Sequence, residues 1–417
     1  MNLIYPTGID EPAPDLEELI TSFLTKAEPV EAEAFYLFRD KRTSALYAEC
    51  HVRAQKLIDL GTVDVALDPD KSEDYRANRN LVDDHAAYAE MVADASQKRS
   101  FSNLVCEFVD TEENSLQVIG GQHRFHAIME ALQEGVSELH GIKVYFGLDK
   151  EQRLDVQVIS NTNISVSKDL LDRMYETVAG SELRDWCQLC GLLEDGEDFA
   201  DKKERGKPLT VKSARTFIAN FYEGFKKSEE KFETISTTPL TIKSGVRNPK
   251  GWDETKKEYV DWASDTALLE AAKQFAVLRA NQVAHYLDAK TLKYKAGSAD
   301  ARDKANNEAV LAAWAYVAGL LQADKTKLAA HYALGEAKKG EPLKAEILGK
   351  GRHATDPEAY RGLGYRTDPQ ERGRFVELFW LQAEKGSGIS AALVKAAIET
   401  FHAKHANLRA AELKAKI

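Results

Sequence analysis

The spacing of apolar residues predicts that strands and helices alternate over residues 60–165. Apolar positions recur with helical periodicity before residue 100, and two apolar runs separated by a polar turn then indicate a hairpin. Such an alternation is typical of a small α+β or α/β domain. In chain order, the expected elements are a strand at Val63–Leu67, a helix over Leu81–Gln97, strands at Leu104–Val109 and Leu116–Ile119, a helix over Gln122–Gln133, a strand at Ile142–Phe146 and a helix over Lys150–Ile159.

The chain on either side of this region is predicted to be mainly helical. Asp15–Leu24 is amphipathic, and Ser44–Leu60 reads as a helix that stops at Gly61. We therefore expect an N-terminal helical arm over residues 1–60, an α+β domain over 61–175 and a helical C-terminal region over 176–417. The helices expected in that last region follow a cap at Thr210, cover Leu268–Leu287 and Glu308–Leu321, and begin again at Ala391.

Composition narrows the class of protein. The 417 residues carry 56 Lys and Arg against 67 Asp and Glu, and this net charge of −11 excludes a simple cationic coat protein for nucleic acid. No apolar run reaches the ~18 residues of a membrane span, and the N-terminus lacks the pattern of a signal peptide. Four cysteines are too few for a disulfide scaffold. We therefore expect a protein of the reducing cytoplasm that does not bind membranes.

Two of the cysteines, Cys187 and Cys190, form a CxxC pair. A structural zinc site usually has four ligands, and the chain offers neither a second CxxC nor a histidine pair at zinc-finger spacing. The sequence favours two small apolar residues on one face of a helix. Zinc binding or redox chemistry remains the alternative.

The sequence Gly120–Arg124, Gly-Gly-Gln-His-Arg, stands between a predicted strand and a predicted helix. Its glycines permit a tight turn and a close approach of ligand to the backbone. The first N–H groups of the helix have no intrahelical partner, and the helix dipole adds positive charge there. Arg124 can fork onto phosphate oxygens, and Gln122 and His123 supply further donors. The pattern predicts a phosphate site, and the alternative is an ordinary turn with a surface arginine.

This motif resembles the DGQHR motif of DndB-like proteins, the GxxR box of the ParB N-terminal domain and the phosphate motif of sulfiredoxin. The similarity extends to the preceding hairpin over Asn103–Val118 and to the next strand, Ile142–Phe146. Ser160–Asn163 stands where ParB proteins carry Glu-Asn-x-Gln or Glu-Asn-x-His. The resemblance covers about residues 60–175 and implies a ParB/sulfiredoxin-like core.

Three positions depart from the family patterns. Gly120 replaces the Asp of the DGQHR motif, and Gln122 replaces the catalytic Cys of sulfiredoxin, so reduction of sulfinic acids is not expected. Ser160 replaces the Glu of the ParB Glu-Asn pair, which removes one expected magnesium ligand. Asn161 remains for a phosphate or for a metal-bound water.

The resemblance implies a nucleotide-binding protein, one that hydrolyses ATP or CTP with Mg²⁺ in a bacterial or phage DNA-modification or defence system. The alternative is a DndB-like, DNA-binding transcriptional regulator without turnover, so whether the chain is an enzyme (an NTPase) stays open. DNA is an expected partner, directly or through other proteins of the system, and a homo-oligomer is left open. The candidate roles are catalysis for Arg124, His123 and Glu107; nucleotide binding for Gly120, Gly121, Gln122, His123, Arg124, Asn161 and Asn163; and a metal contact for Asn161.

Two of these expectations rest on weaker patterns. Glu107 lies in the middle of the first hairpin strand, where a carboxylate would position water or metal near a phosphate, or would simply face solvent. The basic, Gly-containing segment Lys338–Arg374 is the best candidate for nucleic-acid contact, because Tyr332, Tyr360 and Tyr365 interleave with its charges. The alternative for this segment is a solvated loop.

Overall fold

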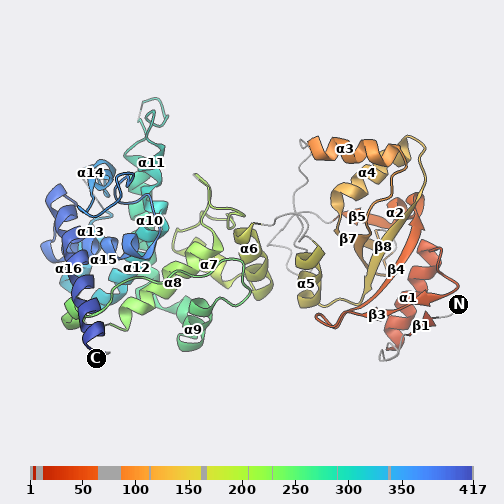
Figure 1. Ribbon diagram of the computed structural model, residues 1–417, viewed down its shortest axis with the longest axis horizontal. Coiled ribbons are helices and arrows are strands. Elements are labelled where there is room, and N and C mark those ends of the chain that lie inside the picture. The colour runs from red at the N-terminus through yellow and green to blue at the C-terminus, as the bar shows by residue number, and fades with distance from the viewer. Residues whose placement is uncertain are drawn as a thin grey trace. The chain divides into compact units, whose positions relative to one another are not determined.

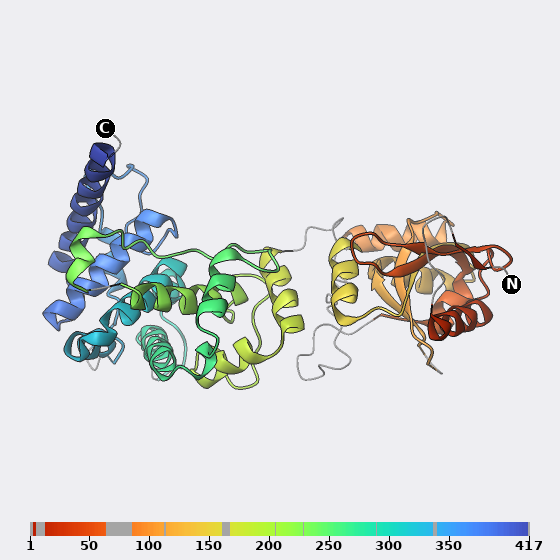
Figure 2. The same cartoon turned by 90° about the horizontal axis from the view of Figure 1, so that it is seen from below.

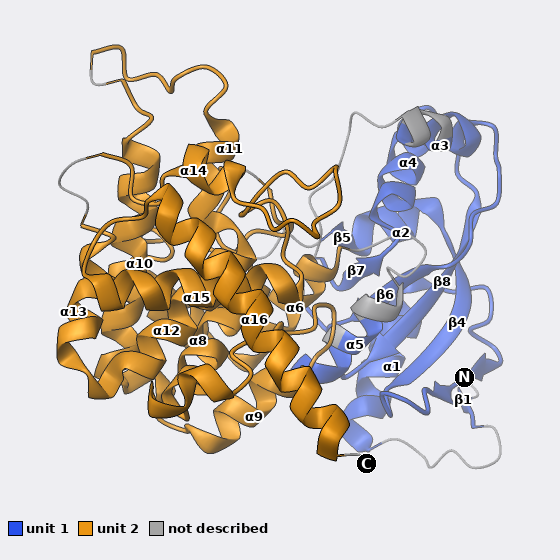
Figure 3. Ribbon diagram, turned by 60° about the vertical axis from the view of Figure 1, so that its left-hand side comes forward, with its two compact units in different colours: residues 1–166 blue, residues 167–417 orange. Residues whose placement is uncertain are grey.

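The structure is a computed structural model and describes residues 3–5, 13–63, 86–111, 114–160, 167–204, 206–227, 229–288, 290–336 and 340–415. The chain forms two compact units, residues 1–166 and residues 167–417 (Figure 3). The first unit holds a β-sheet with helices on both faces, and the second is helical (Figure 1). The fold is therefore α+β, as the sequence predicts.

The sheet of the first unit has six strands in the order β3-β4-β8-β6-β7-β5. β8 runs antiparallel to β4 and parallel to β6, while β7 runs antiparallel to β6 and parallel to β5. A separate parallel pair joins β1 (Leu3–Ile4) to β2 (Phe35–Tyr36). The strands of the main sheet are β3 (Phe38–Arg39), β4 (Leu46–Arg53), β5 (Gly61–Val63), β6 (Leu104–Phe108), β7 (Leu116–Gly120) and β8 (Leu139–Phe146).

Helices cover the two faces of this sheet (Figure 2). On one face, α1 (Pro14–Ala27), α2 (Ala54–Leu60) and α4 (Gln122–Gln133) bury apolar side chains against alternate residues of the strands. On the other face, Val156 of α5 (Lys150–Ser160) packs with Ile119 and Tyr145. α3 (Ala86–Ser96) lies against α4. Successive side chains of a strand point to opposite faces, so each strand contributes to both cores.

Several predictions for this unit are confirmed. The hairpin of β6 and β7 and the helix Gln122–Gln133 lie where the sequence placed them, and β8 and α5 cover the expected strand and helix. The predicted strand Val63–Leu67 overlaps β5 only at Val63, and its remainder lies outside the described residues. α3 covers the later part of the predicted helix Leu81–Gln97, whose first five residues also lie outside them.

The predicted helix Ser44–Leu60 is wrong in its first half. Residues Leu46–Arg53 form β4, whose side chains alternate between buried and exposed, and only Ala54–Leu60 is helical. β4 is an interior strand that pairs with β8 along its whole length. The first 60 residues are therefore part of the sheet domain and not a separate helical arm. The unit also ends at residue 166 rather than 175, because α6 (Lys168–Ala179) belongs to the second unit.

The second unit is built around α12 (Glu308–Leu320), in which every residue is buried. α8 (Val211–Phe225), α10 (Thr266–Ala284), α13 (Lys325–Ala333) and α15 (Pro369–Lys385) surround it. α8 and α12 cross at two glycines: a β-carbon on Gly224 would lie 1.9 Å from the Tyr316 carbonyl oxygen, and one on Gly319 would lie 1.9 Å from that of Phe221. The two backbones therefore touch at the crossing.

The remaining helices of this unit lie around that centre. Thr210 caps α8, as predicted, by accepting a hydrogen bond from the Ser213 N–H. None of the described helices is both long enough and apolar enough to cross a membrane. The other elements are α7 (Glu182–Leu189), η1 (Glu229–Thr234), α9 (Lys250–Glu258), η2 (Trp262–Ser264), α11 (Ala299–Arg302), η3 (Asp303–Asn306), η4 (Leu321–Ala323), α14 (Ala345–Lys350) and α16 (Ala391–Ala415).

Candidate functional site

The motif Gly120–Arg124 joins β7 directly to α4. Gly120 is the last residue of the strand, and Gly121 adopts a left-handed conformation with φ of 94° at the N-cap of the helix. Glycine adopts this conformation without the steric cost that a β-carbon brings. Among the described residues, no side chain caps this end of α4. The N–H groups of its first turn therefore remain available to an anion.

Arg124 lies in the first turn of α4, as predicted, and one edge of its guanidinium is anchored. Nη1 donates to the Ser102 carbonyl oxygen at 2.5 Å, to Ser102 Oγ at 2.6 Å and to the Asn103 carbonyl oxygen at 3.0 Å. Nε and Nη2 make no hydrogen bond to any residue that the structure describes. Nη2 lies over Gly121, 2.7 Å from the place of a β-carbon there. One edge of the cation thus stays available beside the helix N-terminus.

The two residues between Gly121 and Arg124 differ in their surroundings. The ring of His123 meets the ring of Tyr88 edge-on, with 5.9 Å between centroids. Gln122 is 7% exposed, and its side-chain amide has no hydrogen-bond partner within the described ranges. The amide atoms of Gln122 are not among the fully buried unpaired polar atoms of the described residues, so the amide can donate to a ligand at the mouth of the helix.

Glu107 is neither solvent-facing nor part of this site. Its carboxylate is buried and is held by both arms of Arg153 on α5, with Nε to Oε2 at 2.6 Å and Nη2 to Oε1 at 2.8 Å. Glu107 points to the α5 face of β6, whereas its neighbour Cys106 points to the opposite face, on which α4 packs. The sheet therefore separates Glu107 from Arg124, and the predicted catalytic pairing of the two is wrong.

Asn161 and Asn163, the predicted nucleotide contacts that follow α5, lie outside the described residues, and so does any metal contact of Asn161. Within the described residues, no group of three or more His, Cys, Asp and Glu side chains is arranged to hold a metal ion. The site as described consists of Gly120–Arg124 with Ser102 and Asn103. Sequence reasoning missed both of these last residues, because two of their three contacts with Arg124 are main-chain carbonyls and they lie 22 and 21 residues earlier in the chain.

The described part of the segment Lys338–Arg374 contains both exposed and buried cations: Arg352, Arg361 and Arg366 are exposed, whereas Arg372 and Arg374 are buried. Arg374 is 1% exposed and forks onto Asp356, while the guanidinium of Arg372 donates to the main-chain oxygens of Pro239 and Thr367. Tyr360 is also buried, with its hydroxyl on Glu371, so it offers no face for stacking. These three buried side chains hold the helical unit together, while contact between the exposed cations of this segment and nucleic acid stays a prediction.

Cys187 of α7 and Cys190 just after it are buried as free thiols in the apolar core of the second unit. The Cys190 thiol lies 3.4 Å from the Cys187 carbonyl oxygen. Burial raises the pKa of both thiols, that of Cys190 to about 11. Their environment is that of two small core residues on one side of a helix.

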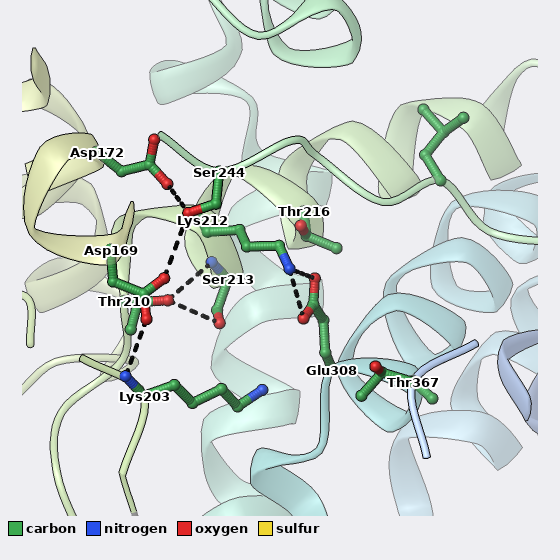
Figure 4. A network of polar contacts seen from close by, with 12 residues as sticks. Asp169, Asp172, Lys203, Thr210, Lys212, Ser213, Thr216, Ser244, Glu308 and Thr367 are labelled. Carbon is green, nitrogen blue, oxygen red and sulfur yellow. Dashed lines mark hydrogen bonds and ion pairs between the residues drawn. The ribbon is translucent and has the colours of Figure 1, made fainter. Parts of the chain in front are cut away.

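The second unit also contains a polar network that the sequence did not reveal (Figure 4). Ser244 donates to Asp172 on α6 at 2.5 Å, and Asp169, one turn earlier, accepts from the Lys203 main-chain N–H at 3.0 Å. Lys212 of α8 pairs with Glu308 at the start of α12 at 2.9 Å. These contacts join α6, α8 and α12, and Asp169, Asp172, Lys212 and Glu308 each already have an opposite charge or a hydrogen-bond donor.

Comparison with known proteins adds no family assignment: no family model, no curated protein and no solved structure matches this chain. The resemblance to the ParB N-terminal domain and to DndB-like proteins thus rests on the motif and its neighbouring elements. What the geometry itself provides is an uncapped helix N-terminus with a glycine turn and an anchored arginine.

Proposed function

We propose that the first unit binds a nucleoside triphosphate, ATP or CTP with Mg²⁺, through its phosphates at the N-terminus of α4. One observation carries this proposal: Gly121 turns the chain in a left-handed conformation and leaves the helix uncapped, with the guanidinium of Arg124 directly over the turn. Backbone N–H groups, the helix dipole and a fixed cation then converge on one point, which is the arrangement that binds phosphate.

The anchoring of Arg124 supports this role. A free surface arginine loses about 2 kcal/mol of side-chain entropy when it is immobilised on a ligand. The bonds from Nη1 to Ser102 and Asn103 fix the side chain beforehand, so less entropy is lost when Nε and Nη2 bind an anion. An anchored cation is therefore better suited to a phosphate than a free one.

The proposal is for binding, and we assign no catalytic base. Glu107 lies on the far face of the sheet. As the motif resemblance implies, the nucleotide would serve a DNA-modification or defence system, either as a substrate for slow hydrolysis or as the ligand of a DNA-binding regulator. Hydrolysis of labelled ATP and CTP by the full chain separates these two roles.

Calorimetry on the full chain with ATP, CTP and GTP in the presence of Mg²⁺ tests the binding. A charge-assisted fork contributes about 1.5–3 kcal/mol, so Arg124→Ala should weaken binding roughly 10- to 100-fold. Arg124→Lys keeps the positive charge but loses the two-pronged geometry of the guanidinium. Its affinity for the nucleotide should lie between those of the wild type and Arg124→Ala. Arg42→Ala is the matched control, because Arg42 is exposed in the turn before β4, and β3 and β4 lie at the other edge of the sheet from β7.

Two results would overturn the proposal. One is that no nucleotide binds the wild type below millimolar concentration. The other is that Arg124→Ala binds as tightly as Arg42→Ala while both variants melt at the wild-type temperature. Arg124 would then serve only to hold Ser102 and Asn103 against α4.

A further inference from the structure

Lys304, in η3 of the second unit, is a buried cation with no carboxylate of the described residues in direct contact. Its side chain is 2% exposed. Nζ lies 3.3 Å from the Leu363 carbonyl oxygen, 3.5 Å from that of Gly364 and 3.6 Å from the centre of the Tyr365 ring. No carboxylate of a described residue comes within 4.0 Å of Nζ. Two long contacts and a ring replace only part of the hydration that an ammonium group loses on burial.

The second unit contains another buried lysine, Lys404, whose surroundings differ from those of Lys304. Lys404 is 4% exposed, and its Nζ lies 2.9 Å from a carboxylate oxygen of Glu377, which is fully buried beside it. Lys404 thus has the direct counter-charge that buried cations usually have. Burial lowers the pKa of Lys304 to about 8, which reflects the weaker compensation there. Lys304 is therefore the exception that calls for an explanation.

A cavity of about 250 Å³ opens beside Lys304. Tyr365 and Gly364 form part of its wall, and Gly364, with φ of 86°, lets the lysine stem pass where a β-carbon would clash at 2.3 Å. Its volume is below the roughly 300–1,000 Å³ of sites for larger ligands, so its occupant is small. The remaining lining residues are two asparagines, Asn306 and Asn307, the cation Lys203, and three acids, Glu204, Asp300 and Asp303.

We propose that this cavity is a binding site for a small zwitterion, an α-amino acid, whose carboxylate bonds to Lys304 and whose ammonium group bonds to the acids of the lining. Two cations and three carboxylates line the cavity, and Asp300 also lies 3.5 Å from Arg361 and Glu204 3.2 Å from Lys202. A ligand with one charge of each sign therefore matches this mixed lining better than an anion alone. A phosphate ester, with almost two negative charges at neutral pH, would meet the three acids unfavourably. The bound carboxylate would supply the counter-charge that Lys304 lacks in the free protein.

Thermal shift and calorimetry on the full chain with the twenty standard α-amino acids test the proposal, with acetate and methylammonium as single-charge probes. At least one amino acid should bind and raise the melting temperature, and neither single-charge probe should match it at equal concentration. Lys304→Met, which keeps the shape without the charge, should weaken that binding about 10- to 100-fold. Asp303→Asn tests the contact with the ammonium group and should reduce the preference for the amino acid over acetate.

Stability separates a binding role from a structural one. Because Lys304 has no carboxylate to leave behind, unliganded Lys304→Met should melt at or above the wild-type temperature, whereas Lys404→Met should melt lower because it orphans Glu377. Lys293→Met, at an exposed loop position, should bind like the wild type. The proposal is wrong if no amino acid binds the wild type, if Lys304→Met binds equally well, or if Lys304→Met loses stability as Lys404→Met does.

Discussion

The guanidinium of Arg124 occupies the space that a β-carbon on Gly121 would need. Nη2 lies 2.7 Å from that position and Cζ lies 3.0 Å from it. Gly121 is therefore required twice, once by its positive φ of 94° and once by this contact. The two residues act as one unit, in which the glycine makes room for the arginine at the mouth of the helix.

Gly121→Ala should destabilise the first unit more than Gly135→Ala does. Both glycines flank α4 and have positive φ, 94° and 88°, but a β-carbon on Gly135 would meet nothing within 4 Å. Each substitution costs about 1–2 kcal/mol for the left-handed conformation. Displacing Arg124 should add about 1–3 kcal/mol at Gly121 alone. Urea denaturation of the two variants measures the difference, and equal losses would mean that Arg124 moves aside freely.

The buried pair of Glu107 and Arg153 predicts strong coupling between α5 and β6. Arg153→Met leaves a carboxylate that is 3% exposed without its cation, and it should cost about 3–5 kcal/mol of unfolding free energy. Adding Glu107→Leu to Arg153→Met should cost less than Arg153→Met alone, because no buried charge is then left unpaired. A double-mutant cycle by chemical denaturation measures the coupling.

The control for that cycle is an exposed pair in the same unit. Nη1 of Arg99 lies 2.6 Å from Oδ2 of Asp94, and the two side chains are 65% and 28% exposed. Arg99→Met should therefore cost less than about 1 kcal/mol. If Arg153→Met lowers the unfolding free energy by no more than Arg99→Met does, water reaches Glu107 and the ion pair does not stabilise the packing of α5 on the sheet.

Lys304 predicts a specific dependence of stability on pH. Its pKa is lowered by burial from 10.5 to about 8 in the folded chain, so between these values the unfolded chain binds more protons than the folded one. Folding stability from this group therefore rises with pH through that window. Relative to Lys304→Met, the wild type should gain roughly 1–3 kcal/mol between pH 8 and pH 10. Urea denaturation of both proteins at several pH values measures this gain. If the unfolding free energies of the two proteins change in parallel with pH, the prediction is wrong.

The four cysteines should be unreactive thiols in the folded protein. All four are buried, and burial raises the pKa of each, that of Cys106 to about 12 and that of Cys190 to about 11. A thiol reagent should react slowly with the native chain, because the thiolate is the reactive form. After denaturation, the same reagent should react with four thiols per chain. Stoichiometric zinc that disappears in Cys187→Ser would contradict the prediction for the CxxC pair.

The sequence predicted those parts of the first unit whose signal is local. The hairpin and α4 follow from short apolar runs, a polar turn and two glycines within one stretch of chain. β4 was missed although Leu46, Ala48, Cys50 and Val52 alternate, because neighbouring residues also fit a helix and Gly61 reads as a helix stop. Its place in the sheet comes from β8, a partner distant in sequence.

The candidate site shows the same division. The glycine turn and the position of Arg124 could be predicted from five consecutive residues. The anchors of its guanidinium are two carbonyl oxygens and the Ser102 hydroxyl, which no local pattern connects with Arg124. Glu107 was misjudged because its counter-charge, Arg153, lies 46 residues further along the chain. Arg372 and Arg374 looked like surface cations because nothing local indicates that α15 is enclosed.

The complete burial of α12 has a consequence for synthesis of the chain. A helix with no face towards water gains its stability from its neighbours, and one of them, α15, begins only at Pro369. During translation, Glu308–Leu320 leaves the ribosome well before α15 exists. The apolar surface of α12 is therefore only partly covered, by α8 and α10, until the ribosome has synthesised the chain beyond Lys385. A ribosome stalled in this interval would expose an aggregation-prone intermediate. The apolar surface of α12 is the part of the nascent chain to which we expect a chaperone to bind.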